Sequence, residues 1–244
     1  MIVERVSRRI LAGVRFQDAI TGERLRNSFE ATAPGVRWIR NRSGDMVVSR
    51  APGLDNHADA PDAPPAIPGL GTAVFQAAVH DPLRLYLPRR LRLALPRSAA
   101  VDDAGDAESL FQPIRCLMFR APSAPVGLNW AVLRASVANE AGDGGLAGAL
   151  LRLVRILDGA LLGVGLTDER GEALVAAAGI PVTTWGESEE DAVIVTEVSA
   201  RVEVVHDPDA AMPDPDDLEA RREDLLVRSA NVTLASGRQA RLSL

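Results

Sequence analysis

Apolar and polar residues alternate along most of this chain, and a period of two predicts β-strands. The first such stretch places Ile10, Ala12, Val14 and Phe16 on alternate positions, as in a strand with one buried face. Alternation or a short apolar run predicts strands at residues 8–18, 36–40, 45–49, 72–80, 91–95, 111–119, 131–138, 149–156, 161–166, 173–177 and 193–205. The stretch 55–71 is rich in Ala, Asp and Pro and predicts a loop instead.

One helix is predicted near the C-terminal end, at residues 215–226. Asp214 is a good N-cap, and Pro215 suits the first helical position. Acidic residues follow in the first turn, where the helix dipole favours negative charge. Beyond the helix, residues 226–244 predict a terminal hairpin that turns at Gly237.

A pattern of strand, glycine turn, strand, glycine turn and strand occurs twice. The turn glycines are Gly22 and Gly44 in the first half, and Gly148 and Gly171 at a similar separation in the second. A duplicated module explains this spacing, and a strand-rich chain with one late helix fits a sandwich. We therefore predict an all-β fold of two related Ig-like β-sandwich lobes with one short C-terminal helix.

The lobes are expected at residues 1–97 and 126–244, joined by a linker with one strand at 98–125. Residues 97–109 are polar and include a glycine and four acids, as in a domain boundary. Residues 121–125 read Ala-Pro-Ser-Ala-Pro, a stiff connection.

Charge is unevenly distributed along the 244 residues. The net charge is −6, and all 27 basic residues are arginine. Residues 1–122 carry 17 Arg and 13 acids, whereas residues 123–244 carry 10 Arg and 20 acids. A basic half and an acidic half favour docking between surfaces of opposite charge. The alternative is an ordinary scatter of charged residues plus one acidic loop. The overall acidity argues against a nucleic-acid partner.

The sequence predicts a cytoplasmic protein without membrane insertion. Residues 1–9 lack the apolar core of a signal peptide. The longest apolar run, 146–166, is interrupted by charged residues and glycines and is too polar to span a bilayer. Cys116 is the only cysteine and has apolar neighbours, which predicts a buried and unreactive thiol.

A family resemblance lies in residues 130–181. The stretches that carry it are Gly145-Leu-Ala-Gly148-Ala-Leu-Leu and Thr167-Asp168-Glu-Arg-Gly171. They resemble the carboxypeptidase regulatory-like domain, which implies a seven-stranded transthyretin-like sandwich without a peptidase zinc site. In the turn, Asp168 can accept backbone N–H groups while Gly171 takes the left-handed conformation.

The first half carries a weaker copy of the same turn before Gly44. There, Arg42-Ser43 stand where the family has Thr-Asp.

A second resemblance covers the whole arrangement. It is carried by residues 14–22, 87–88, 95–96, 121–125 and 167–179. These stretches are similar to small accessory proteins of phage-tail-like contractile injection systems. The resemblance implies a structural part of a tail, cap, baseplate or sheath.

Catalytic, cofactor and metal residues are not assigned. His57, His80 and His206 form no metal-ligand pair, and neither a nucleophile elbow nor a P-loop is present. The acidic stretch 207–217 could bind calcium through its carboxylates. It lacks the glycine of an EF-hand turn, so a solvated loop before a capped helix is favoured, and calcium binding stays open.

Trp38 and Trp185 are the candidate interface residues. Trp38 is flanked by arginines, and Trp185 lies in a Thr-Thr-Trp-Gly-Glu stretch that predicts a surface loop. Such a tryptophan anchors a partner or folds back into the core.

We expect a non-enzymatic structural or adaptor subunit that docks onto other protein subunits, with homo-oligomerisation open. The alternative is a β-sandwich binding module for carbohydrate or peptide, for which nine aromatic residues are a poor supply. A third option, a hydrolase, requires histidines and carboxylates to converge from distant strands.

Overall fold

The computed structural model describes residues 10–26, 28–59, 65–178, 183–185, 193–195 and 197–244. The chain divides into two compact units. The first contains residues up to Gln17, Glu23–Pro82 and Pro88–Leu117, and the second contains Asp18–Gly22, Leu83–Leu87 and Met118–Leu244. Among the described residues, no helix has the length and apolar character needed to cross a membrane.

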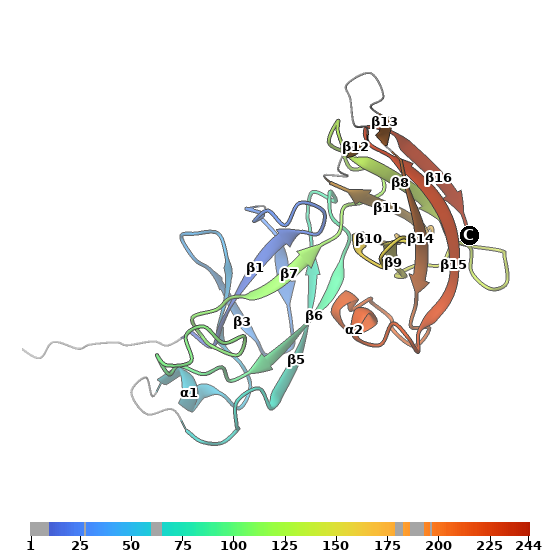
Figure 1. The fold of residues 1–244 in the computed structure, drawn as a ribbon. Coiled ribbons are helices and arrows are strands. Elements are labelled where there is room, and N and C mark those ends of the chain that lie inside the picture. The colour runs from blue at the N-terminus through green and yellow to red at the C-terminus, as the bar shows by residue number, and fades with distance from the viewer. Residues whose placement is uncertain (1–9, 27, 60–64, 179–182, 186–192, 196) are drawn as a thin grey trace, which may run out of the picture. The chain divides into compact units, whose positions relative to one another are not determined.

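The first unit is built from seven strands in two sheets (Figure 1). They are β1 (Ala12–Asp18), β2 (Glu30–Thr32), β3 (Arg37–Arg40), β4 (Met46–Arg50), β5 (Ala73–His80), β6 (Arg89–Leu95) and β7 (Ile114–Met118). The strand orders are β3-β4-β1-β7 and β2-β5-β6. Every second residue of β1 is buried, and the ring of Phe16 lies 4.7 Å from that of Phe29. The alternation that predicted this strand therefore separates its buried face from its outer face.

The second unit has the same number of strands in its two main sheets, plus a small hairpin. The sheet strands are β8 (Ala131–Ser136), β9 (Leu150–Arg155), β10 (Leu161–Leu166), β11 (Glu172–Ala177), β14 (Glu197–Val205), β15 (Leu226–Ala235) and β16 (Gln239–Ser243). Their orders are β10-β9-β14-β15 and β11-β8-β16. The hairpin pairs β12 (Thr183–Trp185) with β13 (Val193–Val195).

The two units share one strand order, apart from a single strand. Counted within each unit, with the hairpin left aside, the fourth, first and seventh strands are neighbours in both: β4-β1-β7 and β11-β8-β16. The second, fifth and sixth strands form the other row: β2-β5-β6 and β9-β14-β15. The third strand differs between the units. In the first unit, β3 pairs with the fourth strand, β4, whereas in the second unit β10 pairs with the second strand, β9. The fold is thus all-β and sandwich-like. The repeat that the glycine pattern indicated is also present in the strand order of the two units.

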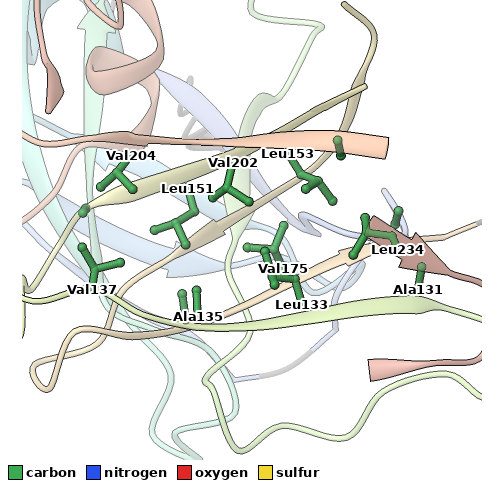
Figure 2. Close-up of a cluster of buried hydrophobic side chains, with 14 residues drawn as sticks. Ala131, Leu133, Ala135, Val137, Leu151, Leu153, Val175, Val202, Val204 and Leu234 are labelled. Carbon is green, nitrogen blue, oxygen red and sulfur yellow. The ribbon is translucent and has the colours of Figure 1, made fainter. Parts of the chain in front are cut away.

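The core of the second unit lies between its two sheets. Figure 2 shows Leu151, Leu153 and Val202 on one side facing Leu133 and Val175 on the other. These five side chains are fully buried. Burial of each contributes about 1.5–3 kcal/mol. Among the described residues, this core cluster is made of aliphatic side chains alone.

In the described ranges of the chain, two short helices accompany the sheets. α2 (Pro215–Ala220) follows the N-cap Asp214 and ends before the predicted 226. A helix that continued to residue 226 would place Glu223 and Asp224 in its last turn, where the helix dipole disfavours negative charge. α1 (Asp55–Asp59) is a helix within the stretch that was predicted to be a loop.

The predicted terminal hairpin is wrong in its pairing. β15 and β16 are both present, but β15 pairs with β14, whereas β16 crosses to the other sheet and pairs in parallel with β8. The turn at Gly237 therefore connects two sheets. The predicted linker at 98–125 stays a prediction, and its strand is present as β7.

Candidate functional site

The turn between β10 and β11 is closed by its own residues. Oδ1 of Asp168 accepts the backbone N–H groups of Arg170 and Glu172, both at 2.9 Å. The Gly171 amide donates to the Asp168 carbonyl at 3.0 Å, and Gly171 has a φ of +74°. The turn thereby fixes the position of Arg170, whose guanidinium contacts both flanking carboxylates.

An equivalent turn connects β3 to β4. Oδ1 of Asn41 accepts the Asp45 amide at 2.9 Å, and the Gly44 amide donates to the Asn41 carbonyl at 3.0 Å. The match of Arg42-Ser43 to the start of the turn was therefore displaced by two residues, because Arg40-Asn41 stand at the Thr-Asp positions. Asn41 takes the place of the aspartate, since its amide oxygen accepts the same backbone N–H.

The glycines of these turns differ in their surroundings. A Cβ on Gly171 would lie 2.3 Å from the Val137 carbonyl oxygen and 2.7 Å from Cα of Gly145. A Cβ on Gly44 or Gly22 meets no heavy atom within 4 Å, although both have positive φ values, +86° and +69°. Close backbone packing therefore accompanies the turn of the second unit alone.

The two candidate interface tryptophans both lie on strands. Trp38 is on β3 opposite Val48, is partly buried, and has a buried indole nitrogen with no acceptor among the described residues. Trp185 is the last residue of β12, opposite Val193, so the predicted surface loop is corrected to a hairpin strand. The Trp185 side chain lies outside what the structure describes. The interface roles of both residues remain predictions.

A basic hollow of about 330 Å³ lies on the outer face of the β11-β8-β16 sheet. Its charged lining residues are Arg134 on β8, Arg241 on β16, Glu172 on β11 and Arg170 from the turn. Its polar uncharged lining residues are Ser123, Ser136 and Ser243. Three arginines and one glutamate give this surface a net positive charge within the acidic half of the chain.

Arg134 and Arg241 form the floor of the hollow. They are directly opposite each other in the parallel pairing of β8 and β16. Neighbouring strands lie about 4.7–4.9 Å apart, so side chains at opposed positions on one face are close neighbours. Within the described part of the chain, no ion pair or side-chain hydrogen bond connects either guanidinium to a carboxylate. Because β8 and β16 are far apart in sequence, the strand pattern did not predict this pair.

The rest of the same face is covered. Val132 and Leu174 are buried beneath Ala124, with Val126 and Trp130 packed against them. The proline-rich connection before β8 therefore lies on the apolar part of the sheet and leaves the basic part open. Pro122 and Ser123 of this connection form one wall of the hollow.

A buried carboxylate holds that connection in place. Asp18 is 1% exposed, and its Oδ2 accepts the Tyr86 hydroxyl at 2.8 Å and Arg120 Nε at 2.7 Å. Arg120 also donates to the Pro125 carbonyl at 2.7 Å and stacks 4.9 Å from the Trp130 ring centroid. The three chain segments of the second unit thus meet at one carboxylate.

Hydrogen bonds keep this carboxylate charged. Burial by itself raises the pKa of Asp18. Hydrogen bonds oppose this effect of burial, and they come from the Thr21 amide, the Tyr86 hydroxyl, the Ile20 amide and the Arg120 side chain. The resulting pKa of Asp18 lies below its usual value. Asp18 is therefore an anion at neutral pH. It serves as an acceptor in the fold, a role that the sequence analysis did not assign to it although it lies within the stretch 14–22.

The acidic stretch 207–217 is bound by an arginine. Arg221 donates to Asp207 at 2.5 Å and also to Asp217. The hydrogen bond from Arg221, followed by the Asp209 amide, holds the pKa of Asp207 below its usual value. Among the described residues, no three His, Cys, Asp or Glu side chains are grouped as metal ligands.

No family model matches the chain, and no curated protein matches it. Similar solved structures include the Bacillus anthracis TIE protein, with 8% identity, a TM-score of 0.29, and coverage of 96% of this chain and 33% of that chain. A streptococcal ancillary pilin has 9% identity, a TM-score of 0.27, and coverage of 86% and 48%. The shaft pilin SpaA from Lactobacillus rhamnosus GG has 13% identity, a TM-score of 0.21, and coverage of 84% and 67%.

This chain therefore spans a third to about a half of the first two structures. Likenesses at these TM-scores carry no argument about fold or function. The resemblance of residues 130–181 to the carboxypeptidase regulatory-like domain stays a prediction.

Proposed function

We propose that this chain is a non-enzymatic structural or adaptor subunit that docks onto other protein subunits through its sheet edges and loops. The observation that carries the proposal is the presence of two sandwich-like units whose sheets end in eight different strands, with β3 and β16 among them. An edge strand presents backbone N–H and C=O groups that can pair with another chain. Repeated sandwich units therefore supply several docking edges on one chain.

The assembly that we propose is a phage-tail-like contractile injection system in the cytoplasm, with the chain in its cap, baseplate or sheath region. The supporting observations are the residues that carry the resemblance, 14–22 and 167–179. The first stretch includes the end of β1 and the Asp18 carboxylate, and the second includes the Asp168–Gly171 turn. Both are parts of the fold with defined hydrogen bonds.

The test is to tag the chain in its native host, lyse the cells gently and identify the proteins that accompany it. Sheath, tube or baseplate-like proteins in a fixed ratio are the expected result. Recovery of a lone monomer would contradict the proposal and favour the alternative, a ligand-binding β-sandwich module. That alternative is a module for carbohydrate or peptide, and the lining of the hollow holds no aromatic side chain for stacking on a sugar.

A further inference from the structure

We propose that the basic hollow binds a carboxylate-rich segment of a partner protein, with Arg134 and Arg241 as its principal contacts. The inference rests on the docking function proposed above and assigns a chemistry to one docking surface. It starts from a feature that the fold alone does not explain, two like charges opposed on neighbouring strands.

The arginine pair opposes the stability of its own sheet. Like charges directly opposite each other on neighbouring strands are destabilising, and Arg134 faces Arg241 in register. Most other arginines of the second unit lie in ion pairs, namely Arg120, Arg152, Arg155, Arg170, Arg201, Arg221 and Arg222. Among the described residues, Arg84, Arg228 and Arg238 have no ion pair, but none of them lines the hollow. In the part of the chain that the structure describes, the floor of the hollow has no such counter-charge, which a bound carboxylate would supply.

The rest of the lining suits a carboxylate. A guanidinium presents a planar fork of donors that matches carboxylate oxygens two at a time. Ser136 and Ser243 are also opposed in the same register, two residues along the strands from the arginines and on the same face, and both residues belong to the lining. Ser123 adds a third hydroxyl from the facing wall. The hollow therefore combines charged forks with neutral donors on one face.

The sheet fixes the backbone from which the floor arginines extend, and ion pairs hold the rim before a ligand arrives. The floor is a regular sheet, and the Arg170 rim is held by Asp168 and Glu172. Donors that are already ordered lose less conformational entropy on binding. Arg170 is largely neutralised by its two carboxylates, so the unpaired arginines of the floor carry most of the attraction.

The hollow fits a protein segment better than a nucleic acid. Its lining holds no aromatic residue on which a base could stack. A nucleic acid requires a broad basic surface for its backbone, whereas one or two acidic side chains require only a local site.

The test measures binding of a blocked hexaglutamate peptide to the full chain by titration calorimetry at low salt. The variant Arg134→Gln/Arg241→Gln removes both charged forks and leaves shorter, neutral polar side chains in their place. The matched control Arg228→Gln/Arg238→Gln removes the same charge from the same unit, outside the hollow. We expect the first variant to weaken binding at least about tenfold and the control to change it less than about twofold, as loss of charge-assisted hydrogen bonds predicts.

A structural role for the arginines is tested by the melting temperature. The hollow variant should melt at the same temperature as the unmodified chain or higher, because it removes a repulsion. A lower melting temperature would make the arginines structural and overturn the proposal. Undetectable peptide binding, equal binding by both variants, or tighter binding of inorganic phosphate or a single-stranded oligonucleotide would also overturn it.

The hollow and the docking function can fail separately. If the tagged hollow variant recovers the same native partners in the same ratio, docking stands and the assignment of the hollow is wrong. If the unmodified chain recovers no partner but binds hexaglutamate through Arg134 and Arg241, the assembly proposal is wrong and the hollow remains a carboxylate site.

Discussion

Arg120 donates a hydrogen bond from Nε to the buried carboxylate of Asp18 at 2.7 Å, and the two residues lie 102 positions apart in the chain. The same guanidinium stacks on Trp130 and donates to the Pro125 carbonyl. One side chain thus connects an early turn to the connection that enters β8. Removal of either partner leaves the other group poorly compensated.

Asp18→Asn should destabilise the second unit. The amide retains the size of the carboxylate but has a single acceptor oxygen and no charge, so charge-assisted hydrogen bonds from Tyr86 and Arg120 are lost or weakened. We expect a loss of about 2 kcal/mol in the free energy of unfolding. Urea unfolding followed by tryptophan fluorescence measures it. Tyr86→Phe is the control for one bond and should cost about half as much; an unchanged Asp18→Asn variant would contradict the structural role.

Acid should remove the contribution of Asp18. The pKa of Asp18 is lower in the folded chain than the ordinary value of 3.8, so the unfolded state binds a proton first as the pH falls. The stabilisation is complete above pH 3.8 and is lost as the pH falls through the folded pKa. The difference in unfolding free energy between the unmodified chain and Asp18→Asn should therefore shrink below that pH. A difference that stays constant from neutral pH to pH 2 would show that ionisation of Asp18 contributes nothing.

The two equivalent turn glycines should respond differently to alanine. Gly44→Ala imposes only the left-handed conformation on a residue with a Cβ, at a cost of about 1–2 kcal/mol. Gly171→Ala adds a Cβ that meets the Val137 carbonyl oxygen and Gly145, which brings the total cost to about 2–5 kcal/mol. Thermal unfolding of both variants measures the difference. Equal losses would mean that the backbone near Gly171 relaxes freely.

Trp185→Ala should lower assembly without lowering the melting temperature. The reason is the predicted interface role of a tryptophan at the end of β12, opposite Val193. Co-purification of partner subunits and the melting temperature are measured together. If both fall, Trp185 belongs to the core and the interface prediction is wrong. Trp38→Phe is a useful comparison, because it removes a buried indole N–H that has no acceptor among the described residues and should not destabilise the chain.

The sequence pattern predicts local structure well and long-range pairing poorly. Alternation identifies β1 because burial has a period of two along a single strand. It says nothing about which sheet a strand joins, so β16 was paired with β15 although it lies beside β8. The Arg134–Arg241 pair depends on that same register and could not be foreseen.

Both hydrogen-bonded turns could have been predicted from the sequence, but the side chain that accepts the hydrogen bond was identified in only one of them. The Asp168 turn was identified because an aspartate stands three residues before a glycine. Asn41 stands at the same distance from Gly44 and makes the same hydrogen bond. A search for either Asp or Asn at that position would have identified both turns, since both side chains accept the backbone N–H.

The displaced third strand has an evolutionary consequence. In the first unit β3 covers the free side of β4, whereas in the second unit β10 lies on β9 and leaves β11 at the end of its sheet. If both units descend from one ancestral module by duplication, the move of this strand made the copies inequivalent without a change in the other six. Each copy could then acquire its own partner independently, so that a single gene product links two different neighbours.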